Sequence, residues 1–166
     1  SIGTDTVDAD YVDLDGDGRR DVVITKSDGP AQFLVLRGTA SGGFAAPMPV
    51  GGPPDVSDDG WTSFADVDGD GRPEAFLVGG GLGDWFVTAF RNVDGDLLRA
   101  TRRWLPLGAG PSTTADVDAD GGLELVIHGR YNTRATLWSL DLSPAPSGTV
   151  GMFDELPGAM AARMLD

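Results

Sequence analysis

The amino-acid sequence predicts an all-β protein built from repeated units, and three observations carry this prediction. The 166 residues include 25 glycines and 11 prolines, a density of turn-forming residues that favours many short strands over long helices. An acidic motif recurs along the chain at a nearly constant interval. Each copy of the motif runs into a short apolar stretch, and no segment has a sustained helical period.

The acidic motif occurs three times, as VDLDGDGRRDVVIT, ADVDGDGRPEAFLV and ADVDADGGLELVIH. Its first aspartates are Asp13, Asp66 and Asp116, so the intervals are 66 − 13 = 53 and 116 − 66 = 50 residues. Self-similarity at such a period is typical of repeat architectures. We therefore expect one structural unit over residues 1–166 that contains the repeats 13–65, 66–115 and 116–165.

Each repeat contains several stretches of strand length. The first follows the acidic motif and is apolar at consecutive positions, as in 75–78, which is the pattern of a strand buried on both faces. Two more stretches follow, and a short segment such as 61–65 leads into the next motif. About four strands in about 50 residues is typical of a β-propeller blade. The alternative is a β-sandwich with accidental acidic turns, which three matching motifs disfavour.

The end of the chain continues the repeat. One further interval, 116 + 50 = 166, gives Asp166 the position of the first aspartates. Segment 161–165 would then be the lone first strand of a fourth blade. Propellers close with about four to eight blades, so we expect a partial propeller that is completed by further blades of a longer chain or by a second copy of this one.

The spacing within the acidic motif is that of a cation-binding loop. Acidic residues occupy positions 1, 3, 5 and 9 of every copy, and glycine occupies position 6. Carboxylates crowded into a tight loop repel one another unless a cation neutralises them, and Ca²⁺ accepts about six to eight oxygen ligands. Glycine permits the sharp turn that brings both ends of the loop around the ion. The sequence therefore predicts three Ca²⁺ sites.

The predicted ligands include one backbone carbonyl per loop, at position 7. They are Asp13, Asp15, Asp17, Asp21 and the carbonyl of Arg19; Asp66, Asp68, Asp70, Glu74 and the carbonyl of Arg72; and Asp116, Asp118, Asp120, Glu124 and the carbonyl of Gly122. An EF-hand would need a bidentate glutamate at position 12 and flanking helices. Position 12 is apolar in each copy, so the residue at position 9 is expected to close the site.

A D-x-D-G-D-G-x-x-[DE] motif that runs into an apolar strand resembles the FG-GAP or VCBS repeat of integrin α-subunit propellers and of many bacterial secreted proteins. The segments GFAAP and GAGP are only loosely similar to the name-giving parts of the FG-GAP repeat, which favours the bacterial branch. The resemblance implies a β-propeller in which each calcium loop joins the first and second strands of a blade. It also implies that the ligands are the positions named above.

Charge and composition exclude several classes of function. With 26 acidic and 12 basic residues the net charge is −14, which disfavours nucleic acid and anionic membranes as partners. No apolar run has the length of a membrane span. The chain has no cysteine, a single histidine, and neither a G-x-S-x-G nor an HExxH motif, so no catalytic constellation is visible.

We therefore expect a calcium-binding module for extracellular binding or adhesion, with a protein or a carbohydrate as ligand, inside a larger secreted or surface protein. Weak calcium sites would fill outside the cell and not in cytosol. One alternative is a polysaccharide-active, lyase-like enzyme with an acid such as Asp59 or Asp84 as base. Another is the structural shell of a bacterial toxin or surface assembly.

Several residues outside the acidic loops carry expectations of their own. Asp94 and Gly95, between two apolar stretches, predict a hairpin turn. Asp8 and Asp10 are expected to be solvated strand residues. The tryptophans divide into two expected core residues and two candidates for ligand contact, respectively Trp85 and Trp138, and Trp61 and Trp104.

Overall fold

The computed structural model describes residues 6–27, 29, 31–52, 54, 60–81, 84–105, 109–116, 119, 121–129, 135–140 and 153–155. Within these residues the chain forms strands and no helix. The strands are β1 (Thr6–Val12), β2 (Asp21–Lys26), β3 (Phe33–Leu36), β4 (Met48–Val50), β5 (Gly60–Ala65), β6 (Glu74–Gly81), β7 (Asp84–Val93), β8 (Asp96–Leu105), β9 (Ala109–Ala115), β10 (Glu124–Gly129), β11 (Ala135–Leu140) and β12 (Phe153–Glu155).

The described strands form three four-stranded antiparallel sheets, each from consecutive strands: β1–β4, β5–β8 and β9–β12. The first hairpin of each sheet closes in the same register, because Val12 pairs with Asp21, Ala65 with Glu74 and Ala115 with Glu124. This arrangement confirms the prediction of an all-β chain with four-stranded blades. Each blade begins one strand before the acidic motif of its repeat.

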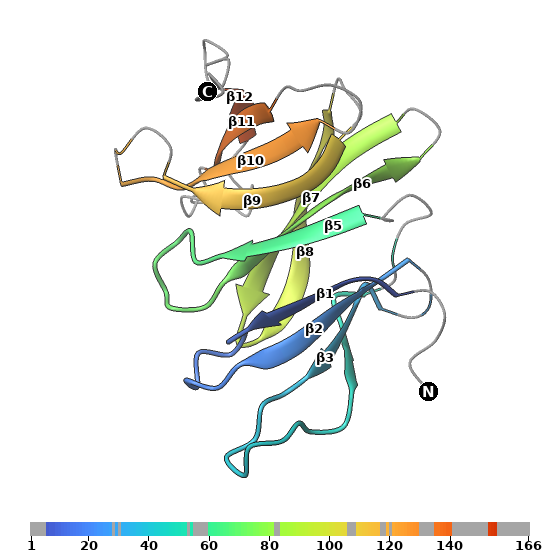
Figure 1. Cartoon of the computed structure of the whole chain (residues 1–166), viewed down its shortest axis with the longest axis vertical. Helices are drawn as coiled ribbons and strands as arrows, with labels where there is room; N and C mark the ends of the chain where they lie inside the picture. The colour runs from blue at the N-terminus through green and yellow to red at the C-terminus, as the bar shows by residue number, and fades with distance from the viewer. Residues whose placement is uncertain are drawn as a thin grey trace, which may run out of the picture.

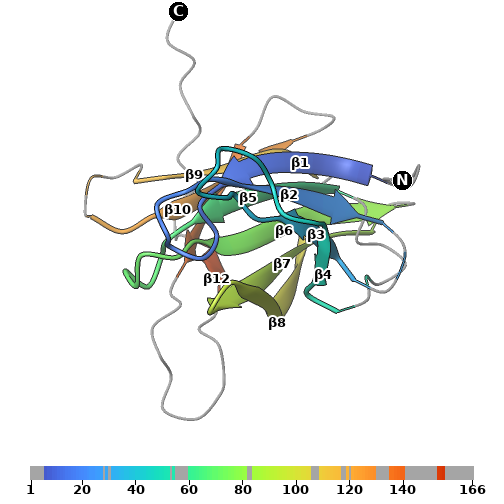
Figure 2. The same cartoon turned by 90° about the horizontal axis from the view of Figure 1, so that it is seen from below.

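The blades stack through their first strands. Strands β1, β5 and β9 lie side by side in the middle of the molecule (Figure 1). In the first two blades the remaining strands follow in order from one side of the molecule to the other (Figure 2). The predicted lone strand of a fourth blade, 161–165 with Asp166, lies outside the described residues.

The hydrophobic core lies between neighbouring blades. One cluster joins the first and second blades and is formed by Leu14, Val23, Phe33, Val35, Val50, Ala75, Leu77, Phe90 and Leu97. A second cluster joins the second and third blades and is formed by Ala65, Phe76, Val78, Trp85, Val87, Ala89, Leu105, Leu125 and Ile127. Successive residues of β6 point alternately into the two clusters. The consecutive apolar residues 75–78 are therefore buried on both faces of the sheet, as predicted.

The hairpin predicted at Asp94 and Gly95 is confirmed. Val93 pairs with Asp96, so the turn between β7 and β8 has two residues. Asp94 has a φ of 54° and Gly95 a φ of 83°. Two central residues with positive φ are the requirement of a type I′ turn, whose twist matches that of the flanking strands.

Candidate metal centres in the acidic loops

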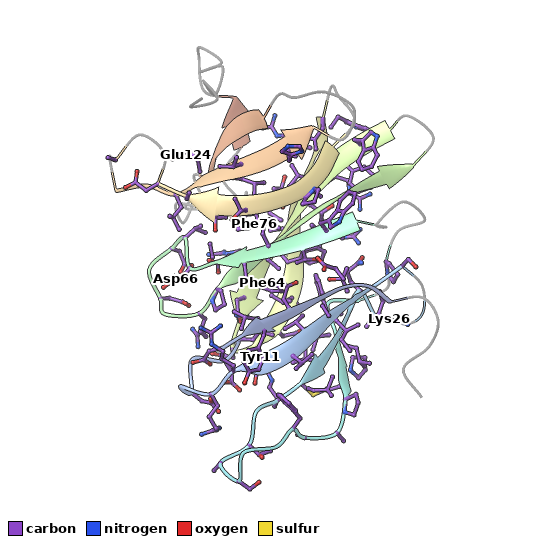
Figure 3. All side chains as sticks on the ribbon, viewed as in Figure 1. Tyr11, Lys26, Phe64, Asp66, Phe76 and Glu124 are labelled. Carbon is purple, nitrogen blue, oxygen red and sulfur yellow. The ribbon has the colours of Figure 1, made fainter. Side chains whose placement is uncertain are left out.

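The three acidic loops lie at one edge of the stacked sheets. Each connects the first and second strands of its blade, through residues 13–20, 66–73 and 116–123. In Figure 1 all three project from the same side of the molecule. Figure 3 places Asp66 in the second loop and Glu124 at the start of β10, where the third loop ends. Each acidic motif therefore occupies the same place in its blade, between the end of the first strand and the start of the second.

The first aspartate organises each loop by accepting backbone hydrogen bonds. Asp13 accepts from the N–H groups at position 4, Gly16 at 2.9 Å, and position 6, Gly18 at 2.8 Å. Asp66 accepts from the same two positions of the second loop at 2.8 and 2.9 Å. Asp116 accepts from the N–H at position 6 of the third loop at 3.1 Å. These bonds fold the loop back onto its first carboxylate.

Positions 4 and 6 adopt the left-handed conformation that this folding requires. At position 6 the φ values are 84°, 86° and 90°, and the residue is glycine in every loop. Position 4 is glycine in the first two loops but Ala119 in the third, with a φ of 63°. A side chain with a Cβ is strained in this region, so Ala119 is a strained position of the third loop.

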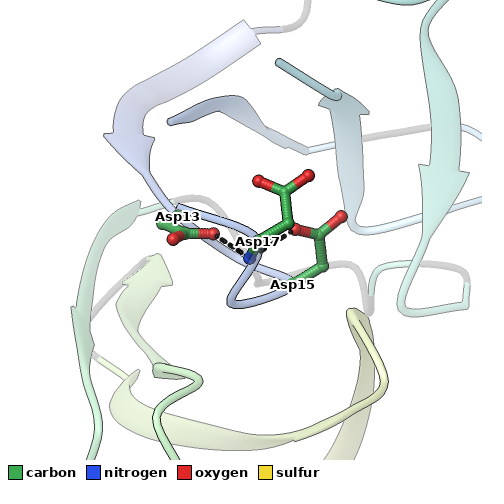
Figure 4. A group of neighbouring side chains, drawn as sticks. All are labelled: Asp13, Asp15 and Asp17. Atoms are coloured by element: carbon green, nitrogen blue, oxygen red, sulfur yellow. Dashed lines mark hydrogen bonds between the residues drawn. The ribbon is translucent and has the colours of Figure 1, made fainter. Parts of the chain in front are cut away.

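The first loop gathers three of its four predicted carboxylates. Oxygens of Asp13, Asp15 and Asp17 lie within 4.8 Å of one another (Figure 4). The backbone N–H of Asp17 donates to Asp13 at 3.1 Å and to Asp15 at 3.3 Å, which holds the three residues together. The Asp17 carboxylate also forms an ion pair with Arg19. This group of oxygens could hold a cation.

The fourth acid of the first loop, Asp21, has partners of its own. It is 1% exposed and accepts hydrogen bonds from the N–H groups of Leu14 at 3.1 Å and Gly38 at 2.8 Å. The guanidinium of Arg37 donates to it at 2.8 Å and lies 3.5 Å from Asp15. Arg37 therefore places a positive charge beside the first group, which the sequence pattern did not indicate.

The second loop gathers a different set of three carboxylates. Oxygens of Asp66, Asp68 and the position 9 acid Glu74 lie within 4.8 Å of one another. Glu74 is 1% exposed, and burial raises its pKa, as do the charges of Asp68 and Asp70 to a lesser extent, while N–H groups of Val67 and Asn92 oppose the rise. A buried carboxyl among acidic neighbours favours a cation in their midst.

The remaining acid of the second loop is paired with an arginine. Asp70 accepts from Arg72 at 2.9 Å, and hydrogen bonds from Arg72 hold the pKa of this carboxyl below its usual value. Arg72 also reaches Asp94 in the β7–β8 turn at 2.9 Å. The side chain of Arg72 thus joins the second loop to the neighbouring hairpin.

The third loop is described in part. Asp116, Ala119, Gly121 and Glu124 are described, and Glu124 is 4% exposed at the start of β10. The predicted ligands Asp118 and Asp120 lie outside the described residues. The predicted carbonyl ligands Arg19, Arg72 and Gly122 stay predictions in all three loops.

Asp8 and Asp10 lie in strand β1 as expected, but both are half-buried rather than fully solvated. Asp8 accepts a hydrogen bond from the backbone N–H of Thr62 at 2.9 Å, between β1 and β5. Burial, reinforced by the charge of Asp8, raises the pKa of Asp10 to about 6. One Asp10 oxygen is buried without a hydrogen-bond partner among the described residues. Sequence alternation along β1 does not reveal this environment, because the contact comes from the next blade.

The described tryptophans divide differently from the expected pairs. Trp85 is 7% exposed, so its predicted place in the core is confirmed. Trp61 stacks on it with ring centroids 6.4 Å apart and 12° between the planes, so the half-buried Trp61 packs against the core. Trp104 is 66% exposed and contacts Phe86 edge to face at 6.0 Å. The side chain of Trp138 lies outside the described residues.

Repeated four-stranded antiparallel sheets, each with an acidic loop between its first and second strands, define a blade-forming repeat protein of the β-propeller type. The family model described as "FG-GAP-like repeat" matches residues 13–77 and again residues 66–127. The chain belongs to this family. Each match begins at the first aspartate of one acidic loop and ends in the strand that follows the next acidic loop, which is β6 or β10. The repeat of the family model therefore has the same period as the acidic motif.

No curated protein matches the sequence. Within the part of the chain that the structure describes, no helix has the length and apolar character needed to cross a membrane.

Proposed function

We propose that the chain is a calcium-binding β-propeller module that binds a protein or carbohydrate ligand outside the cell, as part of a larger secreted or surface protein. The observation that carries the proposal is the second acidic loop. There the buried Glu74 shares a space of 4.8 Å with Asp66 and Asp68. A bound metal ion would neutralise these three carboxylates.

The donor set supports calcium over other metals. Each predicted site consists of carboxylate and carbonyl oxygens, without histidine or cysteine. Hard cations prefer such oxygen donors, whereas zinc and copper prefer nitrogen and sulfur. Ca²⁺ accepts a flexible shell of about six to eight oxygens, while Mg²⁺ demands a smaller octahedron. A loop with four carboxylates and one carbonyl, completed by water, suits the larger ion.

The chain's own residues would orient the ligands. Asp13 and Asp66 hold their loops closed through the N–H groups at positions 4 and 6. Glu74 is held in place by the N–H of Val67 at 3.1 Å. A bound Ca²⁺ supplies positive charge that removes the repulsion among the carboxylates. Calcium would thus fix the hairpin between the first two strands of each blade.

The magnitude of this effect supports an extracellular setting. Extracellular calcium modules have a Kd of roughly 0.1–1 mM. At about 1 mM Ca²⁺ and a Kd near 0.1 mM, each site stabilises the folded state by about 1.4 kcal/mol. Three sites would contribute about 4 kcal/mol, a large part of a typical stability of about 5–15 kcal/mol. In the calcium-poor cytosol the sites would stay largely empty.

For the ligand, Trp104 offers the clearest surface among the described aromatic residues. Trp104 is 66% exposed, and its ring contacts Phe86 edge to face. The guanidinium of Arg102 lies over the same Phe86 ring at 4.1 Å. An exposed aromatic ring beside a guanidinium is suited to contact a protein or a sugar.

Thermal denaturation in the presence of EDTA, 1 mM Ca²⁺ or 1 mM Mg²⁺ tests the proposal. We expect the Tm to rise by several degrees with Ca²⁺ and by less with Mg²⁺. The variant Asp66→Asn with Asp68→Asn should lose about one third of the rise. Isothermal titration gives the number of sites. If Ca²⁺ neither binds nor changes the Tm, the calcium proposal is wrong.

A further inference from the structure

The turn of the β7–β8 hairpin lies between the first and second acidic loops. Asn92, just before this turn, is 6% exposed. Its side-chain Nδ2 donates to the carbonyl of Leu14 at 2.7 Å and to the carbonyl of Pro73 at 3.0 Å. Its Oδ1 accepts from the N–H of Gly95 at 2.8 Å. One buried side chain therefore contacts both loops and the turn.

The two carbonyls that Asn92 holds belong to residues next to predicted ligands of the cation sites. Leu14 stands between the predicted ligands Asp13 and Asp15, and Pro73 stands between Arg72 and Glu74. The backbone N–H of Asn92 also hydrogen-bonds to the Glu74 carboxylate. A displacement of Asn92 would therefore move backbone next to ligands in both loops.

Two arginines reinforce the same connection. Arg37 of the first blade donates to the carbonyl of Gly95 at 2.6 Å and to Asp21 of the first loop at 2.8 Å. Arg72 of the second loop pairs with Asp94 at 2.9 Å. We call residues 92–95 the bridging turn, because both loops are bonded to it.

We propose that Asn92 is a positioning residue that couples cation binding at the first loop to cation binding at the second. The proposal rests on the proposed function, namely that the loops bind Ca²⁺. An ion in one loop fixes the carbonyl that Asn92 contacts, and thereby fixes Asn92 against the other loop. The second ion then has less backbone to order and binds more tightly. By linkage the effect is reciprocal, and typical couplings correspond to about 5- to 150-fold in Kd.

The test compares the first loop with and without a working second loop. All proteins carry Asp116→Asn with Asp118→Asn, which disables the third loop. Isothermal titration with Ca²⁺ gives the Kd of the first loop in this background and after Asp66→Asn with Asp68→Asn. We expect the Kd to rise by about 5- to 150-fold when the second loop cannot bind.

The same comparison is then made with Asn92→Ala. For each protein we take the ratio of the first-loop Kd with the second-loop substitutions to the first-loop Kd without them. The direct charge effect of these substitutions is the same in the protein that keeps Asn92 and in the Asn92→Ala variant, so a change in the ratio measures the coupling that depends on the Asn92 side chain. We expect this ratio to fall at least several-fold towards one. An unchanged ratio would overturn the proposal.

Two variants separate coupling from folding. Asn92→Asp keeps the oxygen that accepts from Gly95 but loses both N–H donors, so it should lose the coupling as Asn92→Ala does. If it keeps the coupling, Asn92 only stabilises the turn and the proposal is wrong. Ser63→Ala removes a different bond between blades, 3.1 Å to Ser112, and should leave the ratio unchanged.

The outcomes also separate this proposal from the one on which it rests. If no loop of the unaltered chain binds Ca²⁺, the proposed function fails and the coupling fails with it. If both loops bind and the ratio does not depend on Asn92, only the coupling fails. Circular dichroism at saturating Ca²⁺ shows whether each variant folds. If Asn92→Ala does not fold, the ratio measured with Asn92→Asp decides whether the coupling depends on the side chain of Asn92.

Discussion

Leu14 is the residue of the first acidic loop whose replacement should cost the most stability. It occupies position 2 of the loop, yet it is fully buried in the cluster between the first and second blades. Leu14→Ala removes three carbon atoms, which is about 2.4 kcal/mol of transfer free energy at about 0.8 kcal/mol per carbon. The cavity adds to this, so we expect a loss of about 3–4 kcal/mol.

For a chain of this length, 1 kcal/mol shifts the Tm by about 2–4 °C, so the Tm should fall by about 6–16 °C. Circular dichroism in urea and thermal scans, both at saturating Ca²⁺, measure the loss. Leu98→Ala is the matched control, because Leu98 is 49% exposed and should cost less than about 1 kcal/mol.

If the first loop binds calcium as proposed, the loss of Leu14 should also weaken that binding. The N–H of Leu14 donates to Asp21 and its carbonyl accepts from Asn92, so a loop without its apolar anchor holds these ligands less firmly. A stability loss below about 1 kcal/mol, or equal losses in the two leucine variants, would refute the reasoning that this side chain anchors the loop to the core.

Three further predictions concern single positions. Ala119→Gly should stabilise the chain by about 0.5–1 kcal/mol in urea denaturation, because it relieves a φ of 63° but adds freedom to the unfolded state; a loss of stability would contradict this. Asp10→Asn should raise the Tm at pH 8, and the increase should become smaller as the pH falls below 6. The pKa of Asp10 is raised to about 6 in the folded state, so the ionised carboxylate disfavours the folded state at higher pH. A difference in Tm that is constant from pH 5 to 8 would argue against this. Gly95→Ala should destabilise by more than about 1 kcal/mol in the same urea assay, because its φ is 83° and a Cβ would overlap Nη2 of Arg37; a neutral result would show that the turn adapts.

Much of the fold could be predicted because its determinants are local and repeated. In each first hairpin, the residue just before the first aspartate of the motif pairs with the acid at position 9. The distance between these two positions is the same in all three motifs, so the register of the hairpin follows from the motif. The turn at Asp94 and Gly95 follows from the two residue types that tolerate positive φ. The alternation of β6 between two core clusters follows from its consecutive apolar residues.

The acidic loops were predictable to the same extent and for the same reason. The bonds that shape them join residues two to seven positions apart, as from Arg72 to Asp70 and from Leu14 to Asp21. The choice of carboxylates that meet was not predictable. Arg37, from the end of the neighbouring β3, contacts Asp21 in the first loop, whereas Glu74 meets Asp66 and Asp68 in the second.

The sequence by itself determined the repeats, the strand order and the shape of each loop, because these depend on interactions within one period. Only the tertiary structure decided how one repeat contacts the next. Asn92 bonds to Leu14 across 78 positions, Arg37 to Gly95 across 58, and Asp8 to Thr62 across 54. The period of the sequence shows that a unit repeats, but it does not show which side chains of neighbouring blades face each other. Those contacts depend on the angle and the distance at which the blades stack. The bridging turn lies at such contacts, and so does Asp8, whose charge helps to raise the pKa of Asp10.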